Sequence, residues 1–422
     1  MVSRRYFLHA SGFDPCDAPG HYGRFVREAA RFGAVWNVAV EVSALRGPGD
    51  SSLPGSAGPD SSWTVTASGP GWRVVTDYVL LDWSDIVRAE TARSPAAHLC
   101  RGVAAFADLV ATGTARRYFA ANWRYGMFFL VPFLSLFLFV LAAAAAGSLA
   151  FAAVPAGFGP LAGAAAATAT AALAFAVLMR WPGGRWRVGQ AMADWAFARD
   201  WMAGRNAAMA ARVEAFAARI ATCARAEGVD EVVVSGHSLG AAVAAEALAR
   251  AFATDPAPGR RAPRIALLTV GAVIPKIALH PRGAWLRDTT RRLAAEPALT
   301  WTEYQARDDY ISFYKVDPVT LVAFGNDHRP EGLGIVRVQL FRMLGDDSFR
   351  RRRRNYMRMH YQFVMANEVR APYDHFMLIC GPAPFAETVA AADGPDGLYG
   401  ADGSYAPGGA AGAAALPSAV AG

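Results

Sequence analysis

Short apolar runs alternate with amphipathic segments along most of the chain. β-branched runs are typical of strands, and apolar residues spaced three or four apart are typical of helices. The predicted strands cover residues 5–11, 34–42, 63–66, 73–81, 231–235, 264–275, 300–305, 334–341 and 376–380. The predicted helices cover residues 21–32, 85–123, 188–226 and 241–252. This alternation predicts an α/β fold, with a mostly parallel sheet and helices on both faces.

One long interval breaks the alternation. No charged residue lies between Arg124 and Arg180. The segment 126–146 would span roughly 31 Å as a helix, which matches the core of a bilayer. After a short Pro/Gly break, residues 161–179 form a second apolar segment, shorter and rich in Ala. Because soluble helices keep a polar face, the interval predicts a two-helix transmembrane hairpin rather than a buried hairpin.

The flanks of this hairpin predict its orientation. Arginines lie just before the first span and just after the second, at positions 116, 117, 124, 180, 185 and 187. The apolar turn between the spans has no Lys or Arg. The positive-inside rule therefore places both ends of the hairpin, and the soluble parts attached to them, in the cytoplasm.

The hairpin divides the chain into predicted parts. Residues 1–124 and 181–392 would be the two halves of one α/β domain, interrupted by the hairpin at 125–180. Residues 393–422 are mostly Gly, Ala, Pro and Ser, which is typical of a disordered tail.

Composition and charge refine this picture. The 422 residues are 54% hydrophobic and only 18% charged, with a formal net charge of +7. Much of that net charge comes from five consecutive arginines: Arg350, Arg351, Arg352, Arg353 and Arg354. The run is a candidate for contact with anionic lipid headgroups, for a place at the mouth of a substrate pocket, or for a solvated loop. A single run does not predict nucleic-acid binding. The four scattered cysteines form no CxxC motif, so neither a metal nor a cofactor is expected.

The strongest chemical motif lies at residues 236–240. A β-branched run ends at Ser235, Gly236-His237-Ser238-Leu239-Gly240 follows, and an Ala-rich helix begins directly afterwards. Strand, GxSxG and helix in this order predict a nucleophile elbow, in which a tight turn exposes the Ser238 hydroxyl. The alternative is an ordinary Gly-rich turn between a strand and a helix.

A serine nucleophile needs a base, and the base needs an orienting acid. Asp309 follows the second strand after the serine and is the predicted acid, with Asp308 as the alternative. Of the later histidines, His360 is the predicted base because it follows strand 334–341, and His375 is the alternative. We interpret His328 as a surface residue.

Stabilising the oxyanion requires two backbone N–H groups. Leu239, directly after the serine, is expected to supply one. The turn after the first strand, Gly12-Phe13-Asp14, offers Phe13 as the second. His237 is next to the serine but is expected to point away from it, in a structural role.

Together these residues resemble the α/β-hydrolase superfamily. They are most similar to class 3 lipase-like serine hydrolases, in a bacterial membrane-anchored subgroup with a helical hairpin ahead of the elbow. The resemblance is carried by residues 12–15, 231–240, 305–309, 359–362 and 373–374. It implies Ser238 as nucleophile, Asp309 as acid and His360 as base. The hairpin differs from secreted lipases, and no lid is recognisable.

The sequence therefore predicts a serine hydrolase of ester or lipid-like acyl substrates, anchored in the bacterial inner membrane with its catalytic domain facing the cytoplasm. The expected partners are the lipid bilayer and a small ester or lipid-like molecule. The alternative is a catalytically inactive scaffold that keeps the fold. The two differ in whether an imidazole, backed by a carboxylate, lies near the Ser238 hydroxyl.

Overall fold

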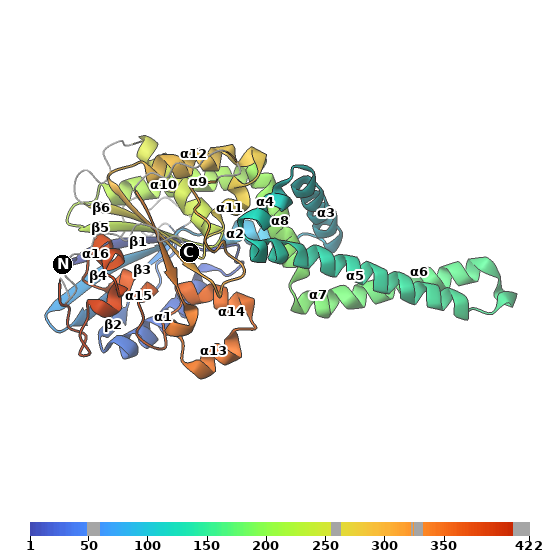
Figure 1. Ribbon diagram of the computed structural model, residues 1–422, viewed down its shortest axis with the longest axis horizontal. Coiled ribbons are helices and arrows are strands. Elements are labelled where there is room, and N and C mark those ends of the chain that lie inside the picture. The colour runs from blue at the N-terminus through green and yellow to red at the C-terminus, as the bar shows by residue number, and fades with distance from the viewer. Residues whose placement is uncertain (49–59, 255–262, 322–323, 325–331, 408–422) are drawn as a thin grey trace. The chain divides into compact units, whose positions relative to one another are not determined.

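The computed structural model describes residues 1–48, 60–254, 263–321, 324 and 332–407 (Figure 1). The chain forms two compact units. The first, Met1–Val87 with Asn206–Gly422, is called the α/β unit below. The second, Arg88–Arg205, is called the helical unit. The helical unit is larger than the predicted hairpin at 125–180, because the helices on either side of the hairpin pack with it and with each other.

A single eight-stranded sheet lies at the centre of the described part of the α/β unit, in the order β2-β3-β4-β1-β5-β6-β7-β8. Its strands are β1 (Arg4–Ala10), β2 (Ala39–Val42), β3 (Ser61–Gly69), β4 (Trp72–Leu80), β5 (Glu231–His237), β6 (Arg264–Val270), β7 (Leu299–Ala306) and β8 (Leu333–Val338). Strands β4, β1, β5, β6, β7 and β8 pair in parallel, while β2-β3 and β3-β4 are antiparallel. The predicted class, a mostly parallel α/β sheet, is confirmed.

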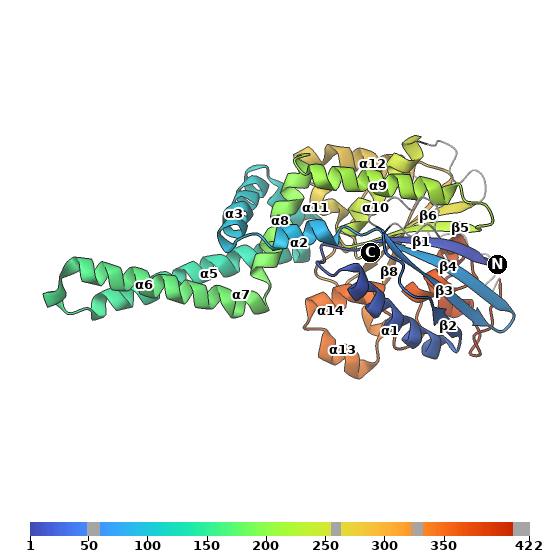
Figure 2. The same cartoon turned by 180° about the vertical axis from the view of Figure 1, so that it is seen from behind.

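Helices cover both faces of this sheet (Figure 2). Those of the α/β unit are α1 (Ala18–Trp36), α9 (Ala207–Ala224), α10 (Gly240–Thr254), α11 (Ile274–Ala278), α12 (Ala284–Ala294), α13 (Asp346–Arg352), α14 (Tyr356–Tyr361), α15 (His375–Cys380) and α16 (Phe385–Ala390), while α2 (Ser84–Thr91) crosses the unit boundary. On one face α10 packs against β1, β5 and β6 and is flanked by α9 and α12. On the other face α1 and α15 contact each other and the strands of the β2-β3-β4 edge.

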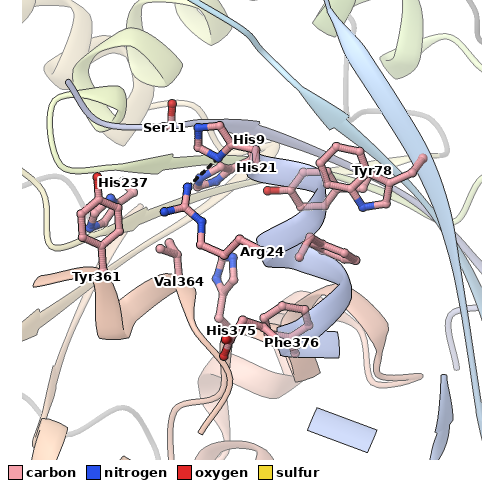
Figure 3. Close-up of a pocket in the computed structure, with 13 residues that line it drawn as sticks. His9, Ser11, His21, Arg24, Tyr78, His237, Tyr361, Val364, His375 and Phe376 are labelled. Atoms are coloured by element: carbon pink, nitrogen blue, oxygen red, sulfur yellow. Dashed lines mark hydrogen bonds between the residues drawn. The ribbon is translucent and has the colours of Figure 1, made fainter. Parts of the chain in front are cut away.

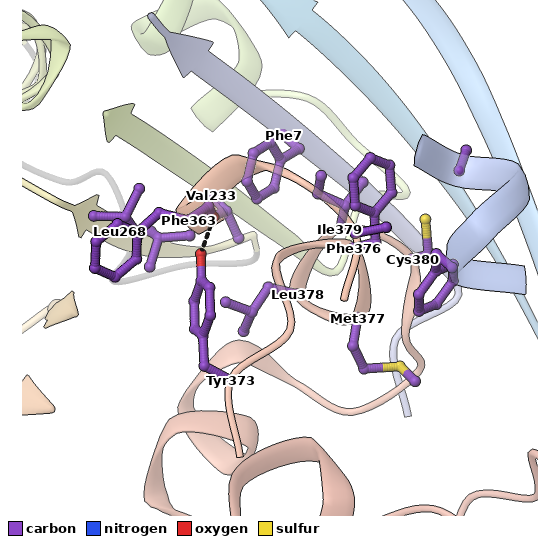
Figure 4. Close-up of a cluster of buried hydrophobic side chains, with 14 of the residues drawn as sticks. Phe7, Val233, Leu268, Phe363, Tyr373, Phe376, Met377, Leu378, Ile379 and Cys380 are labelled. Carbon is purple, nitrogen blue, oxygen red and sulfur yellow. Dashed lines mark hydrogen bonds between the residues drawn. The ribbon is translucent and has the colours of Figure 1, made fainter. Parts of the chain in front are cut away.

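The core under α15 joins the sheet to the end of the chain (Figure 4). Phe7, Val233 and Leu268 come from three adjacent strands and are fully buried. They face Phe363, Tyr373 and the apolar side chains of α15. Apolar burial on both sides of the sheet explains why its central strands are continuous apolar runs rather than alternating ones.

A buried ion pair lies at the amino-terminal ends of the central strands β1 and β5. The Nε–H of Arg5 in β1 donates to Glu231 in β5 over 2.6 Å, and both side chains are at most 3% exposed. The Arg5 guanidinium also donates to the carbonyl groups of Ile379, Gly381 and Ala383. This one arginine therefore connects the central strands to the chain that leaves α15.

Several predicted elements differ in the structure. Residues 34–36 were expected in a strand but continue α1, whose buried residues Phe25, Ala29, Phe32 and Trp36 keep a helical spacing. The expected strand at 376–380 is helix α15, which the Asp374 side chain caps by accepting from the N–H groups of Phe376 and Met377. The expected helix 188–226 is two helices, α8 (Val188–Met202) and α9, and the break comes before Asn206, the cap of α9.

The predicted disordered tail is wrong over its first part. Residues Gly394–Gly397 form a 3-10 helix, and Tyr399 pairs with Tyr405 in a β-bridge. Leu398 and Tyr399 are buried and belong to the core, which outweighs the low complexity of the surrounding sequence. Residues 408–422 lie outside the described part of the chain.

The helical unit contains α3 (Pro95–Ala111), α4 (Thr114–Ala121), α5 (Trp123–Ala153), α6 (Gly159–Arg180), α7 (Pro182–Arg185) and α8 (Val188–Met202). Helices α5 and α6 form the hairpin, and small residues allow their close approach. A Cβ on Gly147 of α5 would lie 2.8 Å from the carbonyl oxygen of Ala167 in α6. Small residues at such contacts are typical of helices that pack within a membrane.

The hairpin is apolar on its surface. In the described part of the chain, two helices, Trp123–Ala153 and Ala156–Arg185, are long and apolar enough to cross a membrane. Phe137, Leu161 and Leu173 are 57%, 85% and 67% exposed within the protein itself. Apolar surface of this extent marks an interaction site, and its length and composition suit a bilayer.

Candidate active site

The strand-turn-helix geometry predicted for a nucleophile elbow is present at the end of β5. Ser238 follows the last strand residue and has φ +56°, the left-handed region that non-glycine residues rarely adopt. The two flanking glycines explain how such a turn fits. A Cβ on Gly236 would lie 2.4 Å from Ala241 Cα, and one on Gly240 would lie 2.2 Å from the carbonyl oxygen of Ala10. Both positions are therefore closed to larger residues.

The elbow lies where successive strands of the chain stop adding to one side of β1 and begin to add to the other side. After β1 the chain builds the β2-β3-β4 side, and with β5 it starts the other side. The carboxyl ends of two parallel strands at such a point form a crevice that commonly binds ligands. Here β1 and β5 end side by side, and a Cβ on Gly12 would lie 2.9 Å from Ser238 Cβ.

Asp309 and His360 form a buried pair. His360 Nδ1 lies 2.7 Å from Asp309 Oδ2, and the two residues are each 2% exposed. The other carboxylate oxygen accepts the N–H of Ile311 over 3.0 Å, which fixes the carboxylate in its loop after β7. A carboxylate only accepts, so His360 Nδ1 donates to it, and in the neutral ring the lone pair is then on Nε2. This is the tautomer that a general base requires.

The imidazole of His360 lies against the elbow. Its ring centroid is 4.4 Å from that of His237, the residue before the serine. A Cβ on Gly271 would lie 3.2 Å from both His360 Cε1 and Asp309 Oδ2, and Val270, just before it, accepts the N–H of Ser238 over 3.2 Å. His360 Nε2 is buried and has no hydrogen-bond partner among the described residues, Ser238 Oγ included. Hydrogen bonds between a general base and its nucleophile are often long in the absence of substrate and shorten when the substrate binds.

The predicted oxyanion donors lie on two turns, Leu239 in the elbow after β5 and Phe13 in the turn after β1. The N–H of Leu239 makes no hydrogen bond within the described part of the chain. It precedes α10, whose N-terminus favours negative charge. Phe13 follows Gly12, the residue that contacts the serine side chain, and its ring packs edge-on against Trp83 at 6.2 Å.

The alternative acid and base lie elsewhere. His360 bonds to Asp309 rather than to Asp308. His375 starts α15, and burial lowers its pKa to about 3, while its Nδ1 lies 3.3 Å from the Tyr373 hydroxyl. His328 lies outside the described residues.

Two residues to which the sequence assigned no role, Gly271 and Tyr361, complete the geometry together with His237. Gly271 leaves room for the Asp309–His360 pair. The Tyr361 hydroxyl donates to Asp14 Oδ2 over 2.7 Å and so connects the turn after β1 to the segment that carries His360. His237 Nε2 lies 3.1 Å from the carbonyl oxygen of His360, so its ring donates there. Burial and the neighbouring His360 hold the pKa of His237 well below its ordinary value, which keeps that ring neutral.

The arginine run lies at the end of α13 and just beyond it. Arg350 pairs with Asp347, and Arg352 pairs with Glu368 over 2.7 Å. Arg351, Arg353 and Arg354 are exposed. Nearby carboxylates thus neutralise part of the run.

No group of three or more His, Cys, Asp or Glu residues suited to a metal ion occurs among the described residues. Comparisons of the chain with protein-family models, curated proteins and solved structures found no match.

Proposed function

We propose that the protein is a serine hydrolase that cleaves an ester or lipid-like acyl substrate and is anchored in a membrane by the α5–α6 hairpin. The fold we propose for the α/β unit is of the α/β-hydrolase type, similar to the class 3 lipases. One observation carries the proposal: a serine held at φ +56° on a strand-to-helix elbow, beside a buried His360 whose free Nε2 is set by Asp309.

In the proposed mechanism, the Ser238 hydroxyl attacks the acyl carbonyl while His360 Nε2 takes its proton. Asp309 holds the imidazole in its tautomer and stabilises the imidazolium that forms. The N–H of Leu239, and that of Phe13, would bind the oxyanion. The imidazolium then protonates the leaving alcohol. Water, deprotonated by the same imidazole, hydrolyses the acyl-enzyme and restores Ser238.

The membrane part of the proposal rests on the exposed apolar surface of α5 and α6. The arginines that flank the hairpin favour a cytoplasmic α/β unit at the bacterial inner membrane. The exposed members of the Arg350–Arg354 run are suited to anionic headgroups. Other than the bilayer and the ester substrate, no partner or cofactor is part of the proposal.

A non-catalytic scaffold is the competing function. A scaffold has no use for a strained serine or for an unpaired buried imidazole nitrogen, both of which cost stability. Their presence at one crevice favours the enzyme.

Hydrolysis of 4-nitrophenyl butyrate by the purified full chain tests the proposal. We expect turnover that Ser238→Ala abolishes and that Ser404→Ala, in a surface turn with Asp402, leaves intact. Turnover by the Ser238→Ala variant equal to wild type would refute the assignment.

A further inference from the structure

A small cavity lies next to the elbow within the α/β unit (Figure 3). Its volume is about 30 Å³, enough for roughly two water molecules or one compact group, and too small for an acyl chain. Polar side chains from β1, α1 and the segment after β8 line it, among them Ser11, His21, Arg24, Tyr361 and His375. We call it the Arg24 cavity.

The Arg24 cavity shares two walls with the candidate active site. His237 and Tyr361 line it, and both rings also contact the ring of His360. Ser11 lines it as well and directly precedes Gly12, which contacts the Ser238 side chain. A polar substrate group bound in this space would therefore lie beside the candidate active site.

Arg24 contributes a guanidinium group to the cavity, and only some of its N–H donors have polar partners among the described residues. Its side chain is 20% exposed, and its guanidinium lies 5.3 Å from the ring centre of Tyr361. Only Nη2 has polar partners among the described residues, His21 Nδ1 at 2.8 Å and Asp14 Oδ2 at 3.6 Å. The Nε–H and Nη1–H donors are free to bind an acceptor.

His21 adds a second donor. An arginine only donates, so His21 Nδ1 accepts from Arg24 and the proton of the neutral ring is on Nε2. That Nε2–H is buried and without a hydrogen-bond partner in the described part of the chain. Burial lowers the pKa of His21 to about 4, so the ring is neutral near pH 7. An unpaired buried N–H is costly and implies an acceptor that arrives with a ligand.

The carboxylates around the cavity already have partners. Glu28 accepts from Arg31 over 2.8 Å and from the N–H of Ala366 over 3.2 Å. Asp14 accepts from the Tyr361 hydroxyl and from the N–H of Cys16. The hydrogen-bonding groups that remain available on Arg24 and His21 are therefore N–H donors, which suits a ligand group made of acceptor oxygens.

We propose that the Arg24 cavity is a recognition subsite for a compact anionic oxygen group, a carboxylate or a phosphate, on the ester substrate. Arg24 is its charge partner and His21 Nε2–H its second donor, so both residues determine specificity. The inference deepens the proposed function, since it rests on Ser238 acting on the same substrate.

Two matched esters test the subsite: 4-nitrophenyl butyrate, and mono-4-nitrophenyl succinate, in which a carboxylate replaces the terminal methyl. We expect kcat/KM to favour the acidic ester by roughly tenfold to a hundredfold, as charged hydrogen bonds would give. Arg24→Gln and His21→Phe should reduce this ratio, and Arg24→Lys should keep part of it. Arg27→Gln, on the exposed side of the same helix, is the matched control and should not change the ratio.

The outcomes separate the two proposals. Ser238-dependent cleavage of both esters with equal kcat/KM overturns the subsite alone, whereas no Ser238-dependent cleavage of either overturns the proposed function. If Arg24→Gln does not fold, inorganic phosphate gives the answer on the wild type. Phosphate should compete with the acidic ester, and the absence of competition overturns the subsite.

Vesicles identify the source of the anionic group. We compare hydrolysis of phosphatidylcholine vesicles with and without phosphatidylglycerol. A preference for the anionic lipid that Arg24→Gln removes supports a headgroup in the subsite, and a preference seen only with the soluble acidic ester supports a small acid. A preference that Arg24→Gln keeps, and that the triple variant Arg351→Gln, Arg353→Gln and Arg354→Gln removes, overturns the subsite in favour of surface attraction.

Discussion

The α/β unit and the α5–α6 hairpin of the helical unit differ in how much apolar side-chain surface they expose to solvent. In the α/β unit, charged side chains such as Arg5 and Glu231 are buried with partners, and the apolar side chains of the sheet are covered by helices. In the α5–α6 hairpin, large apolar side chains such as Phe137 and Leu161 remain exposed. The α/β unit thus covers its apolar side chains with its own helices. The hairpin exposes apolar surface that an apolar environment would stabilise.

This difference suggests that the proposed catalysis belongs to the α/β unit and the proposed membrane attachment to the hairpin. Strained and unpaired groups, such as Ser238 and His360 Nε2, occur in the well-packed α/β unit, where the surrounding structure can hold them. The hairpin carries no charged side chain between Arg124 and Arg180, so in the proposed function it anchors the protein and takes no part in catalysis. Changes in one unit should therefore affect activity, and changes in the other should affect membrane binding.

The largest expected effect is on catalysis. Asp309→Asn leaves the site's shape but removes the carboxylate that sets the His360 tautomer, so kcat should fall on the order of 10⁴-fold. Asp308→Asn is the neighbouring control and should change kcat by less than about tenfold. Ester hydrolysis measures both, and a larger loss for Asp308→Asn would move the acid to that residue.

Breaking the Arg5–Glu231 pair should cost stability. Glu231→Gln leaves the buried Arg5 charge uncompensated, which should lower the free energy of unfolding by about 3–5 kcal/mol. Asp288→Asn, in the exposed pair with Arg291, should lower it by less than about 1 kcal/mol. Urea denaturation followed by circular dichroism compares them, and equal losses would show that burial of the pair is unimportant.

A charge in the hairpin should affect location and not chemistry. Leu138 is 52% exposed near the middle of α5. Leu138→Arg should disfavour insertion by roughly 2.5–3.5 kcal/mol, whereas Leu138→Phe should be neutral. The fraction of protein that stays in carbonate-washed membranes measures this. Wild-type protein that is fully extracted by carbonate would contradict the membrane anchor.

The smallest effect, when it is taken per pH unit, concerns the pH dependence of stability. Burial raises the pKa of Glu303 in β7 to about 8, above the 4.5 of an exposed Glu, beside Gln305, Thr269 and Asp317. The folded state then keeps a proton that the unfolded chain loses, so stability falls as pH rises from about 4.5 to 8, by up to about 1.4 kcal/mol per unit. Glu303→Gln should flatten this slope in denaturation curves from pH 5 to 8. An unchanged slope would mean that Glu303 ionises normally.

Local sequence was sufficient for the elbow, because strand, glycines and serine are consecutive. It also indicated Asp309 and His360, which the structure pairs and which we propose as acid and base, since both follow strands of recognisable composition. The choice of Asp309 over Asp308 depends on which carboxylate turns inward to His360, and that is a tertiary property.

The sequence was less informative near the end of the chain. The apolar run 376–380 is equally compatible with a strand and a short helix, and the cap Asp374 was the signal for a helix. The Arg24 cavity joins α1 to residues more than 300 positions away, such as Tyr361 and His375, so no local pattern reveals it. The buried Tyr399 likewise contradicts the low complexity around it.

Labelling with a fluorophosphonate probe, followed by peptide mapping, tests the central claim most directly. The account predicts one adduct on the Ser238 hydroxyl, formed more slowly in Asp309→Asn and absent in Ser238→Ala. Wild-type protein that folds but takes up no label, or an adduct that persists in Ser238→Ala, would contradict it.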